Sequence, residues 1–346
     1  MQVKMLTASK EILLLTFCMM EVYCSGIQVD PPEEIQLIDR GHLGYLEITW
    51  SLPASLIDMQ ECPIRYQLEY HNIRVQSWTV IKTIHRTYSD QFDLMNDIRV
   101  RVYTLLGGHC TNNTWVRSAN YTELVQNSQS TGLQGSGVKN FRCVFYNMEN
   151  MICTWKRNIT SPSSLQLYLY YWHTELEKTE ECPDYIATNG VRSGCNFTKR
   201  PLPLFTDVNL CVNGSSPKGP LKPTYISIQI QNYVKPDPAD KPHLLSHTPL
   251  KLTWNKPHGK VPEHCLEYEL EHTRVNPGGK YESERISTML TSQTFPTSGE
   301  ERNCFKVRCK LHTYCAEGSF WSKWSDKTCY GHIKKVQDMK KTHKKH

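Results

Sequence analysis

The stretch Leu46-Glu47-Ile48-Thr49-Trp50 alternates apolar with polar residues and ends on a tryptophan. The chain carries two close variants of it, Ile152-Cys153-Thr154-Trp155 and Leu250-Lys251-Leu252-Thr253-Trp254. Strict alternation places the apolar side chains on one face of a β-strand. The tryptophans recur at intervals of roughly 100 residues, about the length of one β-sandwich domain. The sequence therefore predicts three tandem antiparallel β-sandwiches.

Two joints separate the repeats. Residues 127–137 are rich in Gln, Ser and Gly and predict a linker, whereas the prolines within 233–238 predict a stiff elbow. We expect a signal peptide over 1–26, sandwich domains over 27–133, 136–234 and 238–331, and a basic tail over 332–346.

The first 26 residues have the pattern of a secretory signal. Lysines flank the start, an apolar run covers 12–20, and the small residues Ser25 and Gly26 offer a cleavage site. The alternative is a buried first strand. No later stretch reaches the roughly 18 apolar residues of a membrane helix. We therefore expect a secreted protein without stable membrane insertion.

The net charge of +6 comes mostly from the lysine-rich end of the chain. A nucleic-acid-binding domain would carry its basic surface on the fold, so nucleic acid is not expected as a partner. The tail itself is either solvated or in weak contact with heparan or anionic lipid.

Cysteines and sequons indicate an oxidising compartment. Fourteen cysteines in such a chain predict a disulfide framework. Zinc is an alternative at Cys304, Cys309, His312 and Cys315, but their spacing matches no paired Cys-x-x-Cys pattern, so we expect no metal and no cofactor. Five Asn-x-Ser/Thr sequons predict glycosylation at Asn112, Asn120, Asn158, Asn196 and Asn213.

The segment Trp321-Ser322-Lys323-Trp324-Ser325 lies near the end of the third repeat. It resembles the Trp-Ser-x-Trp-Ser signature of class I cytokine receptors, and the Cys143–Cys153 hairpin before Trp155 resembles their second marker. Thrombospondin type 1 repeats also pair tryptophans, but they would need further cysteines after Cys329.

Within that family the chain resembles the interleukin-13 receptors over nearly its whole mature length. The matching stretches, in order, are 44–46, 61–62, 70–73, 92–94, 104–106, 211–216 and 324–327. The resemblance implies an all-β chain of three fibronectin type III-like domains that binds interleukin-13 and stays monomeric. Those receptors continue into a membrane helix and this sequence does not, so we expect a soluble decoy that sequesters the cytokine without signalling.

The signature also implies a stacked ladder of side chains. Trp321 and Trp324 share one side of an extended segment with three residues per turn. Lys306, Arg308 and Lys310 share one face of the preceding strand. The resemblance implies that these cations interleave with the indoles, with Ser322 and Ser325 in the same motif; each contact would contribute about 0.5–2 kcal/mol. The alternative is that the cations are solvated.

Disulfide pairing follows partly from spacing and partly from the resemblance. Cys143 and Cys153 flank a turn near 147–150, so a hairpin brings them opposite each other. The resemblance implies the pairs Cys62–Cys110, Cys182–Cys195 and Cys265–Cys315. Cys211, Cys304, Cys309 and Cys329 stay unassigned.

The resemblance also implies two contacts with the cytokine. Class I receptors bind cytokine helices at the elbow, where the loop after the Lys306–Lys310 strand carries Tyr314 and Glu317, and Glu267 starts a nearby strand. The alternative for Tyr314 is packing against Cys315. In the first domain an edge strand containing Trp78, Val80 and Ile81 is expected to pair with a cytokine strand.

The sequence contains none of the catalytic motifs considered. The chain lacks a Gly-x-Ser-x-Gly elbow, a phosphate loop and a His-Glu-x-x-His pair. We therefore expect no enzyme. A secreted enzyme and an adhesive or matrix fibronectin array are the alternatives to a receptor.

Overall fold

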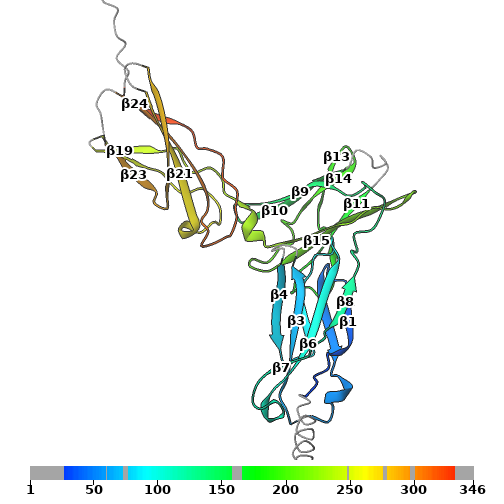
Figure 1. Cartoon of the computed structure of the whole chain (residues 1–346). Helices are drawn as coiled ribbons and strands as arrows, with labels where there is room; N and C mark the ends of the chain where they lie inside the picture. The colour runs from blue at the N-terminus through cyan, green and yellow to red at the C-terminus, as the bar shows by residue number, and fades with distance from the viewer. Residues whose placement is uncertain are drawn as a thin grey trace, which may run out of the picture. The chain divides into compact units, whose positions relative to one another are not determined.

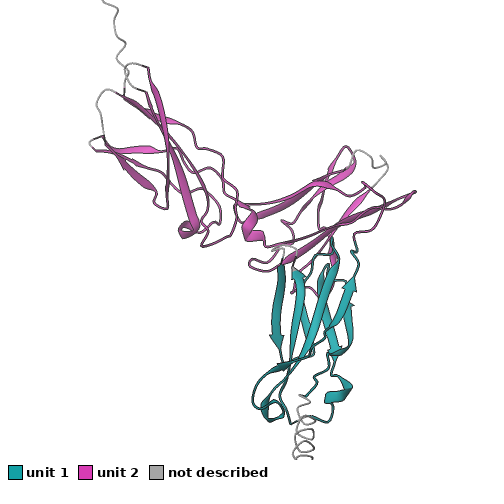
Figure 2. Ribbon diagram, in the orientation of Figure 1, with its two compact units in different colours: residues 1–129 teal, residues 130–346 magenta. Residues whose placement is uncertain are grey.

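The structure is a computed structural model that describes residues 27–59, 61–72, 77–157, 166–247, 249–275, 279–296 and 301–331. They form two compact units, divided between Gln129 and Ser130 (Figures 1 and 2). The expected signal peptide over 1–26, the tail over 332–346 and the sequon at Asn158 lie outside the described residues. Within the described ranges no helix combines the length and apolarity needed to cross a membrane.

The first unit is a sandwich of two antiparallel sheets. One sheet has the order β1-β2-β5 and the other β4-β3-β6-β7, with β8 also paired to β6. The elements are β1 (Glu33–Asp39), β2 (Tyr45–Ser51), η1 (Ala54–Leu56), β3 (Ile64–Asn72), β4 (Ser77–Thr83), β5 (Thr87–Gln91), β6 (Ile98–Leu106), η2 (Gly108–Thr111), β7 (Val116–Arg117) and β8 (Thr122–Gln126).

The second unit holds two further sandwiches. The earlier one packs a sheet of order β13-β14-β10-β9-β18 against a sheet of order β12-β11-β15-β16. In the second of these sheets β17 also pairs with β15. Its elements are β9 (Lys139–Tyr146), β10 (Asn150–Lys156), β11 (Leu167–Trp172), β12 (Glu180–Glu181), β13 (Tyr185–Thr188), β14 (Val191–Asn196), β15 (Val208–Ser216), β16 (Gly219–Pro220), β17 (Thr224–Ile228), η3 (Ile230–Tyr233) and β18 (Val234–Lys235).

The last sandwich packs a sheet β19-β20-β23 against a sheet β22-β21-β24-β25. Its elements are β19 (His243–His247), β20 (Leu250–Thr253), η4 (Glu263–Cys265), β21 (Leu266–Val275), β22 (Tyr281–Thr288), β23 (Ser292–Phe295), β24 (Arg302–Leu311) and β25 (Thr328–Tyr330). The all-β prediction of tandem sandwiches is confirmed.

The repeated tryptophans are buried in the three sandwiches. Trp50 packs edge-on against Tyr66 with ring centroids 5.5 Å apart, and Trp254 packs the same way against Tyr268 at 5.8 Å. In both cases the tyrosine comes from the alternating strand that follows the tryptophan. The repeat visible in the sequence is therefore a repeat of core contacts.

Part of the segment predicted as a linker belongs to the second unit. There the Ser130 hydroxyl donates to the Pro223 carbonyl at 2.8 Å and the Leu133 amide to that of Pro220 at 3.1 Å. At the elbow β18 pairs in parallel with β9. One hydrophobic cluster runs through the second and third sandwiches, which makes the elbow a packed joint.

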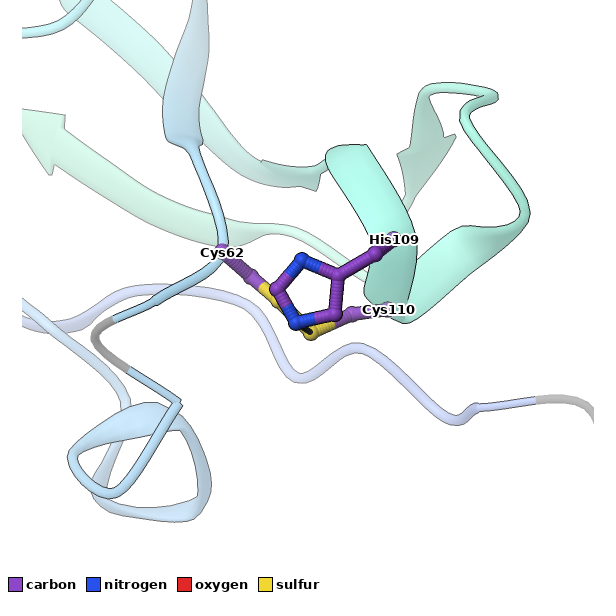
Figure 3. Close-up of side chains that lie close together, drawn as sticks. All are labelled: Cys62, His109 and Cys110. Atoms are coloured by element: carbon purple, nitrogen blue, oxygen red, sulfur yellow. Dashed lines mark hydrogen bonds between the residues drawn. A yellow bond between two sulfur atoms is a disulfide. The ribbon is translucent and has the colours of Figure 1, made fainter.

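Five disulfides join ten of the twelve described cysteines. Besides the four pairs expected, the structure contains Cys304–Cys329, which joins β24 to β25. Cys304 and Cys315 are thus bonded to Cys329 and Cys265, so neither is a free thiolate for zinc. His109 lies beside the Cys62–Cys110 disulfide (Figure 3). Its two neighbouring sulfur atoms are bonded to each other, so they are not free thiolates either.

Cys211 and Cys309 are buried free thiols, and burial raises the pKa of Cys211 to about 12 and that of Cys309 to about 11. Because the thiolate is the reactive form, we expect neither to react with iodoacetamide at about pH 8 in the native protein. Peptide mass spectrometry should show both labelled after unfolding. Labelling of either in the native state would contradict this burial.

Candidate functional site

The outer face of β24 carries a row of three cations, and each faces a glutamate across the sheet. Register pairs Lys306, Arg308 and Lys310 with Glu271, Glu269 and Glu267 of β21. The shortest N–O distances are 2.8 Å for Lys306–Glu271, 2.5 Å for Arg308–Glu269 and 3.5 Å for Lys310–Glu267. Alternation along two neighbouring strands thus builds two rows of opposite charge.

The two signature tryptophans stack on these cations. The Arg308 guanidinium lies 4.4 Å from the Trp321 ring centroid and 4.6 Å from that of Trp324. Lys306 lies 4.4 Å from Trp324, and Lys310 lies 5.0 Å from Trp321. Arg308 is therefore the central rung of the ladder, and these cations are not simply solvated.

The serines of the signature hold this segment on β24 through the backbone. Ser322 donates its amide to the Cys309 carbonyl at 2.7 Å and accepts the Cys309 amide on its hydroxyl at 3.0 Å. Ser325 does the same with Val307, at 2.8 and 3.0 Å. Each serine therefore satisfies both backbone groups of one β24 residue, as a neighbouring strand would.

Glu271 is the most constrained carboxylate of the row. Burial raises the pKa of Glu271, but the Lys306 ammonium that hydrogen-bonds it, together with Arg285, outweighs burial and holds that pKa below its usual value. Its charged form is stabilised in the folded state.

Glu267, expected at the cytokine contact, belongs to this ladder. Its carboxylate pairs with Lys310 and is mostly buried. A role of Glu267 in binding stays a prediction.

Tyr314 is the most exposed large hydrophobic side chain described, at 86%. It follows β24 next to Cys315, which is bonded to Cys265. Its ring centroid lies 4.2 Å from that of His312, and its high exposure shows that the side chain is not buried against the disulfide. This exposure argues against the packing alternative.

Two loops from different sandwiches are tied to η3 at the elbow. The Glu317 amide donates to the Asn232 side chain at 2.9 Å, and the Phe205 amide donates to the Gln231 side chain at 3.0 Å. Gln231 and Asn232 are consecutive, so η3 braces both loops. The exposed residues Phe205, Tyr314 and Glu317 of these two loops are together called the elbow surface below.

Phe205 was not among the site residues predicted from the sequence. Its side chain is 68% exposed and its backbone is left-handed, with φ of 56°. A phenylalanine rarely adopts this conformation, and strained exposed residues concentrate at functional sites. The available signal was a pair of large apolar residues, Leu204 and Phe205, after two prolines in a loop.

In the first unit β4 is an edge strand, paired only with β3 among the described strands. Val80 projects outward and is 52% exposed, and Trp78 beside it stacks on Arg101 at 4.4 Å. Ile81 points to the other face, opposite Leu68. The backbone groups along the free side of β4 are available to another strand.

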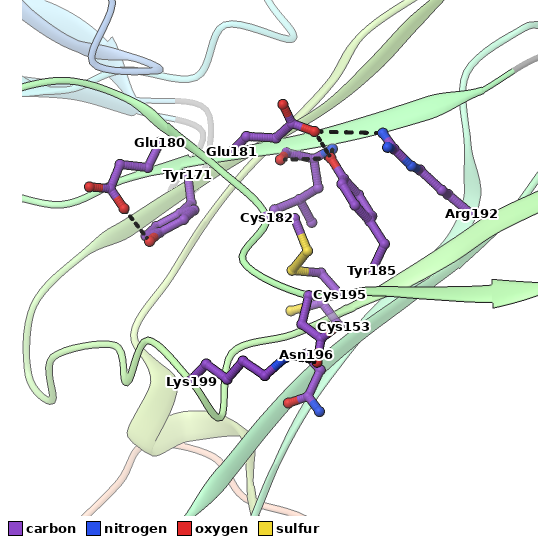
Figure 4. The surroundings of a disulfide bond; sticks show 12 residues. Cys153, Tyr171, Glu180, Glu181, Cys182, Tyr185, Arg192, Cys195, Asn196 and Lys199 are labelled. Atoms are coloured by element: carbon purple, nitrogen blue, oxygen red, sulfur yellow. Dashed lines mark hydrogen bonds and ion pairs between the residues drawn. A yellow bond between two sulfur atoms is a disulfide. The ribbon is translucent and has the colours of Figure 1, made fainter.

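The described sequons differ in exposure. Asn112 and Asn120 are exposed, whereas Asn196 and Asn213 are half-buried. Asn196 lies beside the Cys182–Cys195 disulfide, where Tyr185 donates to Glu181 at 2.9 Å and Tyr171 to Glu180 at 2.7 Å (Figure 4). Glycosylation of each stays a prediction.

Replacing Arg308 by Ala removes the central rung of the ladder and an ion pair. We expect a loss of about 1–3 kcal/mol in the free energy of unfolding, measured in denaturant, because stacking and the packing of the side-chain stem are both lost. Arg302→Ala, at the exposed start of β24, should have little effect. An Arg308→Ala protein as stable as wild type would refute the structural role of the ladder.

Replacing Glu271 by Gln should make stability less dependent on acid pH. A lowered folded-state pKa contributes stability above the unfolded pKa of about 4.3, and this contribution disappears as pH falls through the folded pKa. The gap in unfolding free energy between wild type and variant should be largest at neutral pH and close on acidification. Glu263→Gln, at an exposed carboxyl of η4, serves as the control. A gap independent of pH would contradict the assignment.

Comparison with known proteins matches this chain to cytokine receptors. A family model described as the binding domain of the interleukin-6 receptor alpha chain matches residues 140–233. A solved structure titled as a cytokine receptor complex covers 57% of this chain and 98% of its own, at 18% identity and a TM-score of 0.43, a likeness too partial to support an assignment.

Full-length relatives give the assignment. Interleukin-13 receptor subunit alpha-2 of Canis lupus familiaris is 36% identical over 307 residues, which cover 88% of this chain and 78% of the relative. The same subunit of Homo sapiens is 35% identical over 312 residues, covering 88% and 80%. Interleukin-13 receptor subunit alpha-1 of Mus musculus is 24% identical over 338 residues, covering 92% and 76%. The chain belongs to the interleukin-13 receptor subunit alpha-2 family of cytokine-binding receptors.

Proposed function

We propose that this receptor binds interleukin-13 through the elbow surface and withholds it from other receptors. The observation that carries the proposal is the exposure of Tyr314 and Phe205 on two loops braced by one element, η3. Aromatic side chains dominate the binding energy of protein interfaces, and charged neighbours such as Glu317 contribute orientation and association rate. The names of the relatives supply the identity of the cytokine.

The first unit supplies a second contact in this proposal. The free edge of β4 would accept an extended cytokine strand by backbone hydrogen bonds, with Val80 and Trp78 beside it. This contact adds to the elbow surface, so removing the first unit should weaken binding without abolishing it.

Sequestration and secretion complete the proposal. A cytokine surface covered by this receptor is not available to a second receptor, so the purified protein should compete for interleukin-13 and return it intact. Five disulfides and the exposed sequons at Asn112 and Asn120 suit an oxidising extracellular location. The sandwiches are proposed to cover residues 27–133, 136–234 and 238–331.

Tyr314→Ala should weaken interleukin-13 binding by at least about 2 kcal/mol, or roughly 30-fold in Kd, because it removes an aromatic anchor of the interface. Surface plasmon resonance on folded protein, with interleukin-4 as a comparison ligand, measures this. Tyr281→Ala is a matched control, because that tyrosine is 62% exposed but lies on β22, away from the elbow surface.

Glu317→Ala and Phe205→Ala should each weaken binding through the same surface. Unchanged affinity in a folded Tyr314→Ala/Glu317→Ala double variant would place the site elsewhere.

A further inference from the structure

Asn147 uses all four of its polar groups at the elbow. It lies at the tip of the hairpin between β9 and β10 with φ of 54°, a left-handed conformation that asparagine tolerates. Its amide donates to the Lys235 carbonyl at 3.2 Å, and its carbonyl accepts the Lys260 amide at 3.0 Å. Its side chain accepts the Asp237 amide at 2.7 Å and donates to the Asp237 carboxylate at 2.8 Å.

These partners join the hairpin of the second sandwich to the start and body of the third. Lys235 ends β18, Asp237 follows it in the elbow, and Lys260 lies in the loop between β20 and η4. The approach is close at Gly259, where a Cβ atom would lie 2.6 Å from that of Asn147. Gly259 also has φ of +112°, so both its backbone and its lack of a side chain suit this contact.

The side-chain amide of Asn147 matches the groups that Asp237 presents. Asp237 offers one donor, its backbone N–H, and one acceptor, its carboxylate, to the same side chain. The amide bonds both at once, since it carries one acceptor oxygen and donor hydrogens. A carboxylate at position 147 would meet that of Asp237 at hydrogen-bond distance and repel it.

We propose that Asn147 is a positioning residue that fixes the angle between the second and third sandwiches, and thereby the spacing of Phe205 from Tyr314 and Glu317. The consequence for binding rests on the proposed function; the geometric part does not. The hydrophobic contacts at the joint, including Phe320, whose ring meets that of Tyr233 at 6.4 Å, do not involve the Asn147 side chain. They keep the sandwiches attached when the amide is lost.

An exchange of the two side chains tests the proposal. Asn147→Asp should break the pair, whereas Asp237→Asn should be tolerated because an amide oxygen can still accept. The Asn147→Asp/Asp237→Asn double variant should restore it, with donor and acceptor exchanged. Asn189→Asp is the matched control: Asn189 also has a left-handed backbone, with φ of 53°, but it lies in the exposed turn between β13 and β14.

Two measurements on the whole protein are needed. Spin labels on the second and third sandwiches report their separation without cytokine, and surface plasmon resonance reports interleukin-13 affinity. We expect Asn147→Asp to broaden the distance distribution and weaken binding about tenfold or more, while circular dichroism stays that of folded sandwiches. The double variant should recover both.

The outcomes separate the two claims. An unchanged distance distribution in Asn147→Asp, or no rescue in the double variant, overturns the proposal. Broadening with unchanged affinity overturns its consequence for binding. If wild type itself fails to bind interleukin-13 while the distances behave as expected, the proposed function fails and the role of Asn147 in fixing the elbow stands.

Discussion

The free edge of β24 is the constraint on which the third sandwich depends. Among the described residues, the strand has no β-strand neighbour on that side beyond Phe305, because β25 pairs only as far as Phe305. Its backbone groups must still be hydrogen-bonded where they are buried. Ser322 and Ser325 meet this need at Cys309 and Val307, and their spacing of three residues leaves the tryptophan before each of them free to stack on the cations.

The sequence predicts the elements whose periods are local. Alternation identified the strands, and three-residue spacing placed Trp321 and Trp324 on one side of their segment, whereas the stacked ladder was implied by the resemblance to class I cytokine receptors. The glutamate row was also visible, since Glu267 and Glu269 alternate with apolar residues, but the register between β21 and β24 that pairs them with Lys310 and Arg308 is a non-local property. Glu267 was therefore expected only as a residue of the cytokine contact, whereas the structure pairs it with Lys310 of the ladder.

The unassigned cysteines show the same limit. Cys309 lies on the inward face of β24 with Val307 and Leu311, whereas Cys304, at an odd spacing from Cys309, lies on the opposite face. Only the position of β25 decides that Cys329 reaches Cys304 and leaves Cys309 free. The sequence did not predict Phe205 for a related reason. Its left-handed backbone and the hydrogen bond from its amide to the Gln231 side chain are not visible in a local sequence pattern.

A binding surface built from loops gains affinity only if the loops are already ordered, because immobilising flexible side chains and backbone costs free energy on association. Here η3 holds both loops of the elbow surface from one short element, and β18, which follows it directly, is paired with β9. Movement of the third sandwich relative to the second would therefore change the spacing of Phe205 and Tyr314, while each loop keeps its own conformation. Under the proposed function, the packing of this joint therefore contributes to binding, although none of the residues that create it needs to touch the cytokine.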